Sequence, residues 1–260
     1  MFLKKIIDTL TGEEGRRAGA SLESVTRDIE ACRILEHETY GSRIVLVDTP
    51  GFEDSKRSDE EILKLIGEWL KKTYVKLNLM PHTTKPHPHR YKKRILLSGI
   101  VYMHRITDFR MAAAPHRNLL MFAELTGPRS AKNVVLVTTM WDTLNPTCQN
   151  EGVEREKGLK TKYWNTMIYH GAAAERFLNN SDSAWRIINN IVDRNKNDEK
   201  PVLQFQEERV DRKKTLKETG AGQALYQDLN RLIERQNKTM QVSTTWSNSS
   251  GSTLGAQEPE

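Results

Sequence analysis

The sequence predicts an α/β domain of three layers with a mostly parallel sheet, and three short apolar runs carry this prediction. Residues 44–47, 99–103 and 134–137 each have the length and composition of a buried strand. Helical patterns separate the runs, as in a parallel sheet that is covered by helices. Asp48 and Asp142 each follow a run closely, at the sheet edge where parallel α/β folds bind ligands.

The composition favours a reducing compartment and a chain without membrane spans. Cys32 and Cys148 are the only cysteines among the 260 residues, which argues against a disulfide framework or a zinc site and favours a cytoplasmic location. No apolar run is long enough to cross a membrane, and we expect no transmembrane segment and no signal peptide before the first helix.

The formal net charge of +6 comes from one segment, residues 76–94, which holds six basic residues and no acid. We therefore expect a basic insertion, not a folded basic face, and no nucleic-acid partner. Three prolines in the segment stop helix and strand alike. Its three histidines could bind a metal, but no cysteine or acid joins them, so a solvated Pro/His/Lys loop is favoured.

The first part of the chain reads as a helix, a loop and a hairpin. Residues 2–11 have the apolar period of an amphipathic helix, which Gly12 ends. Residues 13–27 are polar and predict a loop. Residues 28–35 predict an edge strand that turns back, through residues 37–42, into the strand that ends at Asp48.

A capped helix and two further strands follow. Ser58 and the acidic residues after it predict a helix start. A serine cap accepts a hydrogen bond from a free backbone N–H group of the first turn, and acidic side chains interact favourably with the positive end of the helix dipole. This helix runs to Tyr74. Beyond the strand at 99–103, residues 105–110 predict a surface ion-pair loop, with a nucleotide or dimer contact as the alternative.

The next predicted helix spans residues 117–125, and its inward residues are Leu119, Leu120, Phe122 and Leu125. The strand at 133–139 follows it.

The last part of the domain predicts two helices around a short strand. Residues 151–170 form a charged helix, with three of its apolar residues buried. These residues are Tyr163, Trp164 and Met167. Residues 171–177 form the last strand, and residues 183–192 form the closing helix.

These elements place one domain at residues 1–195 and a helical extension at 201–240, with a break at residues 220–222. Residues 243–260 have no apolar period and predict a disordered tail.

Two loops resemble motifs of the P-loop GTPase superfamily. Residues 48–52, Asp-Thr-Pro-Gly-Phe, match the D-x-x-G loop, and residues 139–142, Thr-Met-Trp-Asp, match the N-K-x-D loop. The residues of these two motifs are similar to those of septins, of GIMAP-type immune-associated GTPases and of fungal G-domain proteins. The resemblance implies a P-loop NTPase-like G domain that binds GTP or GDP together with Mg²⁺.

The resemblance also implies roles for single residues. Asp48 would hold Mg²⁺ through water and Gly51 would sense the γ-phosphate, while Thr139 and Asp142 would form the loop that reads guanine. For Asp48 an ordinary strand end with a turn is the alternative.

Two weaker matches extend this set. Thr26 lies in a segment similar to switch I and would complete the coordination of Mg²⁺, with a plain Ser/Thr loop as the alternative. Gly171 and Ala172 stand where the S-A-K loop would touch the guanine.

The sequence departs from the family pattern in three ways. The phosphate-binding loop, G-x-x-x-x-G-K-[ST], does not occur in these 260 residues. We therefore expect the first strand to be missing from the sheet and nucleotide binding to be weak. Met140 replaces the lysine that packs over the base. Phe52 replaces the water-orienting glutamine of Ras-like enzymes, so no catalytic residue is assigned and hydrolysis should be slow.

The sequence thus favours a GTP-binding protein that acts, in its full-length form, as a slow GTPase or nucleotide switch. A homodimer through the G domain is a further expectation. The alternative is a degraded G domain that binds no nucleotide and serves as a protein-interaction module through its helical tail.

Overall fold

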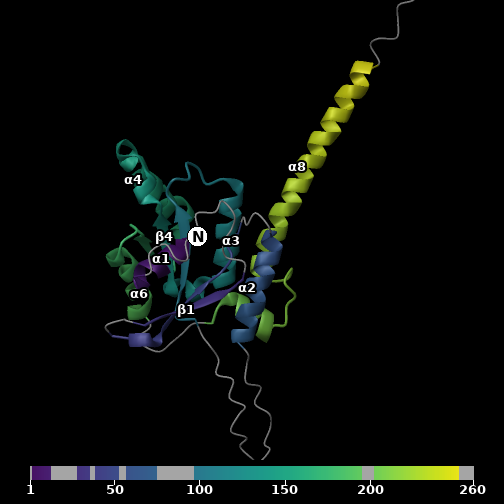
Figure 1. Cartoon of the computed structure of the whole chain (residues 1–260). Helices are drawn as coiled ribbons and strands as arrows, with labels where there is room; N and C mark the ends of the chain where they lie inside the picture. Colours follow the sequence, from purple (N-terminus) through teal and green to yellow (C-terminus); the bar gives the residue numbers. More distant parts are fainter. Residues whose placement is uncertain are drawn as a thin grey trace, which may run out of the picture.

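The computed structural model describes residues 2–12, 28–35, 39–52, 57–74, 97–194 and 202–251 (Figure 1). The predicted insertion at 76–94 and Thr26 lie outside these residues. The fold is α/β, as predicted, with one parallel sheet of three strands and a separate antiparallel pair.

The parallel sheet is built around β4 (Val134–Thr139), which pairs with β3 (Ile100–Arg105) on one side and with β5 (Ala173–Arg176) on the other. All six residues of β4 are buried. Neighbouring strands satisfy its backbone on both edges, and helices cover both faces, so an uninterrupted apolar run is stable there. The predicted central strand is confirmed.

Side chains of β4 alternate between two separate cores. Val134 and Leu136 enter a core with residues of α3 (Ala113–Thr126), of α5 (Asn165–Tyr169) and of the loops next to these helices. Val135 and Val137 enter the core on the opposite face of the sheet. This alternation follows from the two-residue repeat of a strand and places the sheet in the middle of three layers.

The opposite face of the sheet is covered by α1 (Phe2–Thr11) and α6 (Ser181–Arg194), through Ile6 and Ile187 among others. The observed bounds of α1 are those that the sequence predicted. Gly12 follows it at φ +68°, a left-handed conformation that glycine adopts at helix ends without strain.

The antiparallel pair consists of β1 (Glu30–Ile34) and β2 (Ile44–Asp48), with Glu30 opposite Asp48 in the register. The predicted hairpin is therefore confirmed. The expectation that β2 is buried on both faces was wrong, because Val45 is 47% exposed.

The described residues place no strand between β2 and β3, and the two sheets are not hydrogen-bonded to each other. Among the described residues β2 and β3 therefore do not close up into a direct pair.

Helix α2 (Asp59–Thr73) begins with the predicted serine cap. The Ser58 hydroxyl accepts a hydrogen bond from the Glu61 amide, and the Glu61 carboxylate accepts one from the Ser58 amide. This reciprocal pairing satisfies two backbone N–H donors at the helix start and fixes its first turn. Arg117 of α3 pairs with Asp59, which ties the two helices together.

The C-terminal extension shares a core with α2 and α3. It contains α7 (Gln204–Gln206), the π-helical turn η6 (Glu207–Asp211) and the long helix α8 (Gly220–Gly251). Phe205 and Leu225 are buried against Leu63 and Met121 among others. The extension therefore packs onto the body of the protein through its first part.

Helix α8 begins at the glycines that were expected to break a helix. The Thr219 hydroxyl accepts a hydrogen bond from the Gly222 amide, as a capping side chain does. The helix then leaves the body and projects from it as a single rod (Figure 1). It continues to Gly251 and so includes residues 243–251, which were expected in an unstructured tail. Residues 252–260 lie outside the described part.

Two details of the helical layer differ from the predictions. The charged helix expected at 151–170 is divided into α4 (Gln149–Gly158), a π-helical turn η5 (Leu159–Tyr163) and α5. Trp164 and Met167 are buried as expected, but Tyr163 is 38% exposed.

In α3, Leu120 is exposed and Met121 is buried. The helix packs against the sheet on one side and against α8 on the other, so only a narrow stripe faces solvent.

Short 3-10 turns complete the description, at Gly41–Arg43, Pro128–Asn133, Trp141–Thr143 and Pro146–Cys148. No helix in the described part of the chain is both long and apolar enough to cross a membrane.

Candidate functional site

The carboxyl ends of the parallel strands bring three loops to one edge of the sheet. These loops follow His104–Arg105, Thr138–Thr139 and Arg176, which end β3, β4 and β5 in register. Ligands of open α/β sheets bind outside this edge. The loop after β4 holds Thr139 and Asp142, two of the predicted site residues.

Thr139 is fully buried and contributes to the structure of the loop. Its hydroxyl donates to the His104 carbonyl at 3.3 Å, and its own carbonyl accepts from the Ile106 amide at 3.0 Å. Both contacts join the ends of β3 and β4. Thr139 therefore anchors the loop from within, and its side chain does not face solvent.

The next three residues turn one side chain inward and one outward. Met140 has φ +66°, a left-handed conformation that is uncommon for a residue with a side chain. Trp141 is buried, whereas the side chain of Asp142 is 45% exposed. The turn at Met140 thus presents the Asp142 carboxylate at the edge of the sheet.

The first turns of α1 lie between the two predicted aspartates. Lys5 Nζ is 3.6 Å from Asp142 Oδ2, and Lys4 Nζ is 3.4 Å from Glu30 Oε2. Glu30 is the cross-strand partner of Asp48. The structure therefore brings the ends of β2 and β4 to either side of α1, although the two sheets do not pair.

Asp48 ends β2 as a buried side chain, 5% exposed, and Gly51 follows in an open position. Among the described residues, a Cβ atom at Gly51 would meet no atom within 4 Å, so other groups can approach its backbone. Phe52 packs against the core that α2, α3 and α8 share. Its ring thus has a structural partner, which explains an apolar residue at this position.

Gly171 and Ala172 lie at the other end of the sheet. They precede β5, whereas Asp142 follows β4, and the two strands are parallel. The Gly171 carbonyl accepts a hydrogen bond from Arg194 of α6, and its backbone lies beside Lys132. The structure therefore does not bring these two residues to Asp142, which corrects the predicted guanine contact.

The loop that does follow β5 begins at Phe177 and Leu178. Leu178 is 44% exposed, and Asn179 takes a left-handed φ of +57°. Sequence reasoning placed the nucleotide contact before the strand and not after it. The rule that ligand loops follow parallel strands would have directed the prediction to this loop.

The loop after β3 holds the predicted surface ion pair. Arg105 Nε lies 3.3 Å from Asp108 Oδ1, and the Arg105 side chain is 51% exposed. The neighbouring His104 is buried, and burial, which outweighs the attraction of Asp108, lowers the pKa of its imidazole. His104 is therefore a neutral residue of the strand end at neutral pH.

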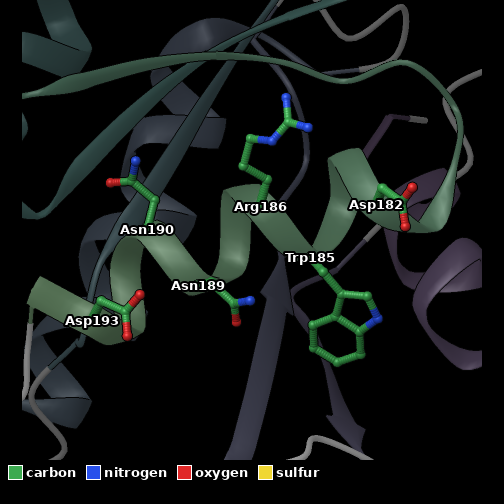
Figure 2. Close-up of a pocket in the computed structure, with 6 residues that line it drawn as sticks. All are labelled: Asp182, Trp185, Arg186, Asn189, Asn190 and Asp193. Carbon is green, nitrogen blue, oxygen red and sulfur yellow. The ribbon is translucent and has the colours of Figure 1, made fainter.

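Two surface hollows lie away from this edge. The larger, about 500 Å³, is lined by residues of α6 only, including Trp185 and Arg186, and its side chains point outward along one helix (Figure 2). The second, about 290 Å³, lies between the end of α3 and the extension, near Arg129 and Glu207. Neither hollow is lined by Asp48 or Asp142.

Within the described residues, no group of three or more His, Cys, Asp or Glu side chains could hold a metal ion. Any ion at Asp48 would therefore need further ligands from outside this set. Thr26, the other predicted ligand, is not among the described residues.

Solved structures with a similar fold come from Toc33 of Arabidopsis thaliana. A dimerisation-deficient variant has a TM-score of 0.51 and 14% identity, with 75% of this chain and 80% of that chain covered. Toc33 in complex with Mg²⁺ and GMPPNP has a TM-score of 0.46 and 13% identity, with 73% and 79% covered. No protein-family model and no curated protein matches the sequence. The likeness shows the fold, which is that of a P-loop G domain.

Proposed function

We propose that this protein binds guanine nucleotide and that, in its full-length form, it acts as a slow GTPase or nucleotide switch. The observation that carries the proposal is the placement of the Asp48 and Asp142 loops on either side of the first turns of α1, at the carboxyl edge of a G-domain fold. A phosphate chain and a base can then occupy the two ends of one site.

Asp142 is the proposed base-recognition residue. An ionised carboxylate can accept two hydrogen bonds from the N1 and N2 donors of guanine, each worth about 1.5–3 kcal/mol when charge-assisted. Adenine lacks this pair of donors. The ion pair with Lys5 is half-exposed on both sides and is therefore weak enough to be exchanged for a ligand.

Asp48 is the proposed Mg²⁺ residue, acting through water, with Thr26 as a second ligand. Mg²⁺ is commonly bound by one or two carboxylates together with phosphates and waters, so one buried carboxylate fits this ion without a cluster of protein ligands. The ion would neutralise charge on the phosphates. Gly51 would let the backbone approach the terminal phosphate.

Hydrolysis should be slow because Phe52 cannot orient water. Its ring packs into the core and offers no hydrogen-bonding group.

The proposal also includes a cytoplasmic location, which the low cysteine content supports. It further includes a homodimer through the G domain, which sedimentation with and without nucleotide would test.

Calorimetry with GDP, ADP and XDP tests the assignment of Asp142. We expect the chain to prefer GDP to ADP, and Asp142→Asn to lose at least about 10-fold in GDP affinity and gain affinity for XDP, because an amide can pair with the extra xanthine carbonyl. Asp182→Asn, an exposed change on α6, is the matched control. Equal affinities for GDP and ADP would contradict base recognition by Asp142.

A second candidate function is a protein-interaction module without nucleotide binding. It is favoured by α8, which projects from the body with Ile233 and Met240 more than half exposed. Measurable binding of GDP in the same titration would decide against this candidate, since a module of this kind would bind none of the three nucleotides.

A further inference from the structure

A closed set of contacts lies beneath the loop that presents Asp142. Glu156 of α4 is buried, and its carboxylate accepts two hydrogen bonds from Arg176 of β5, from Nε at 3.0 Å and from Nη2 at 2.5 Å. Lys160 Nζ lies 3.3 Å from the same carboxylate. This two-point pairing fixes the plane of the Arg176 guanidinium as well as its position.

The fixed guanidinium lies over the loop tryptophan. The Arg176 Cζ atom is 4.1 Å from the centre of the Trp141 ring. On its other side, Trp141 donates from Nε1 to the Thr138 hydroxyl at 3.0 Å. That hydroxyl donates in turn to Glu156 Oε1 at 3.3 Å, with the Glu175 carbonyl as an alternative acceptor at 3.4 Å. The contacts therefore return to Glu156.

The Asp142 carboxylate lies one residue beyond this set of contacts. Asp142 is half-exposed, and the partner found for it, Lys5, is half-exposed too, so its own side-chain contacts hold it weakly. Its orientation depends on the backbone of the preceding residue, Trp141. The left-handed conformation at Met140 is strained for a residue with a side chain and persists only where the surroundings hold it.

We propose that Arg176, held by Glu156, is a positioning residue for base recognition: it fixes Trp141 and thereby the angle at which Asp142 meets the guanine edge. The inference rests on the proposed function of Asp142. Two parallel hydrogen bonds to one carboxylate require a fixed angle, so a looser loop should lower selectivity for guanine more than it lowers total affinity.

The test compares Arg176→Lys and Trp141→Phe with Arg186→Lys, a surface control on α6, all in the 260-residue chain. Lysine keeps the charge at position 176 but cannot pair at two points and stack at once. Phenylalanine keeps an apolar ring and removes the indole donor. Hydrogen exchange of amides 140–143 measures the loop directly, and thermal melting shows that each variant remains folded.

We expect both variants to exchange these amides about 10-fold faster than the wild type, with the control unchanged. Where GDP and ADP binding can be measured, their affinity ratio should fall about 10-fold. Unchanged exchange overturns the proposal, even in a chain that binds no nucleotide. Faster exchange with an unchanged GDP/ADP ratio overturns the role in recognition. If the wild type shows no preference for guanine but both variants exchange faster, the proposed function is refuted and the positioning of the loop remains supported.

Discussion

Glu156 is a buried charge whose partners decide its protonation. Burial by itself would raise the pKa of this carboxyl, but hydrogen bonds from Arg176 and the charge of Lys160 outweigh burial and lower the pKa below its usual 4.5. A carboxyl with a lowered folded pKa adds stability above its unfolded pKa. That stability is lost as pH falls through the folded pKa.

Glu156→Gln should therefore destabilise the protein most at neutral pH. We expect a loss of roughly 1–2 kcal/mol in the free energy of unfolding, allowing for water near the half-exposed Arg176. Below pH 4.5 the difference from wild type should shrink, because the wild type then loses the same contribution. Urea unfolding of both proteins between pH 3 and pH 7 measures this difference in the free energy of unfolding. A difference that grows as pH falls would contradict the charged role of Glu156.

At the scale of elements, α8 changes character along its length. Leu225 is 1% exposed in the core with α2 and α3, whereas the described side chains from Gln227 onward to Gln241 are exposed. Isolated helices gain little stability from propensity alone, and packing stabilises most helices in proteins. The first two turns of α8 therefore belong to the folded body, and the remainder adds little to its stability.

Removal of residues 227–251 with the chain beyond them should leave the melting temperature almost unchanged. Leu225→Ala, by contrast, removes a buried side chain and should cost about 3 kcal/mol, or roughly 6–12 °C for a domain of this size. Scanning calorimetry of both variants makes the comparison. If the shortened chain melts as early as Leu225→Ala, the projecting part of α8 has a partner within the molecule.

At the scale of the whole molecule, the two sheets have different support. β4 is paired on both edges and covered on both faces, whereas β2 pairs only with β1 among the described residues and exposes Val45. The contacts of α1 with Glu30 and Asp142 link the hairpin to the parallel sheet through side chains. Side-chain ion pairs of this kind are weaker than a strand ladder.

Native-state hydrogen exchange should therefore divide the strands into two classes. We expect the amides of β4 to exchange only through global unfolding, and those of β2 to exchange at lower denaturant through local opening of the hairpin. Lys4→Gln should speed exchange in β1 and β2 and leave β4 unchanged. Equal protection of β2 and β4 would show that the two sheets unfold as one unit.

Elements with strong local signals can be predicted from the sequence. The apolar period of residues 2–11, the cap at Ser58 and the uninterrupted run of β4 each predict their element because propensity, capping and burial agree there. The same holds for the loop of Asp142, because a polar group after a buried parallel strand lies at the edge of the sheet where ligands bind.

Contacts between distant parts of the chain depend on how the elements pack together. Gly171 and Asp142 are separated because β4 and β5 pair in parallel, with Gly171 before one strand and Asp142 after the other. Leu120 is exposed although it was expected to face inward, and Met121 is buried, because α3 packs on two sides. The contacts of Glu156, Thr138, Trp141 and Arg176 join α4, β4, β5 and the 3-10 turn after β4. Their energy depends on distances that arise only when the sheet and α4 are assembled.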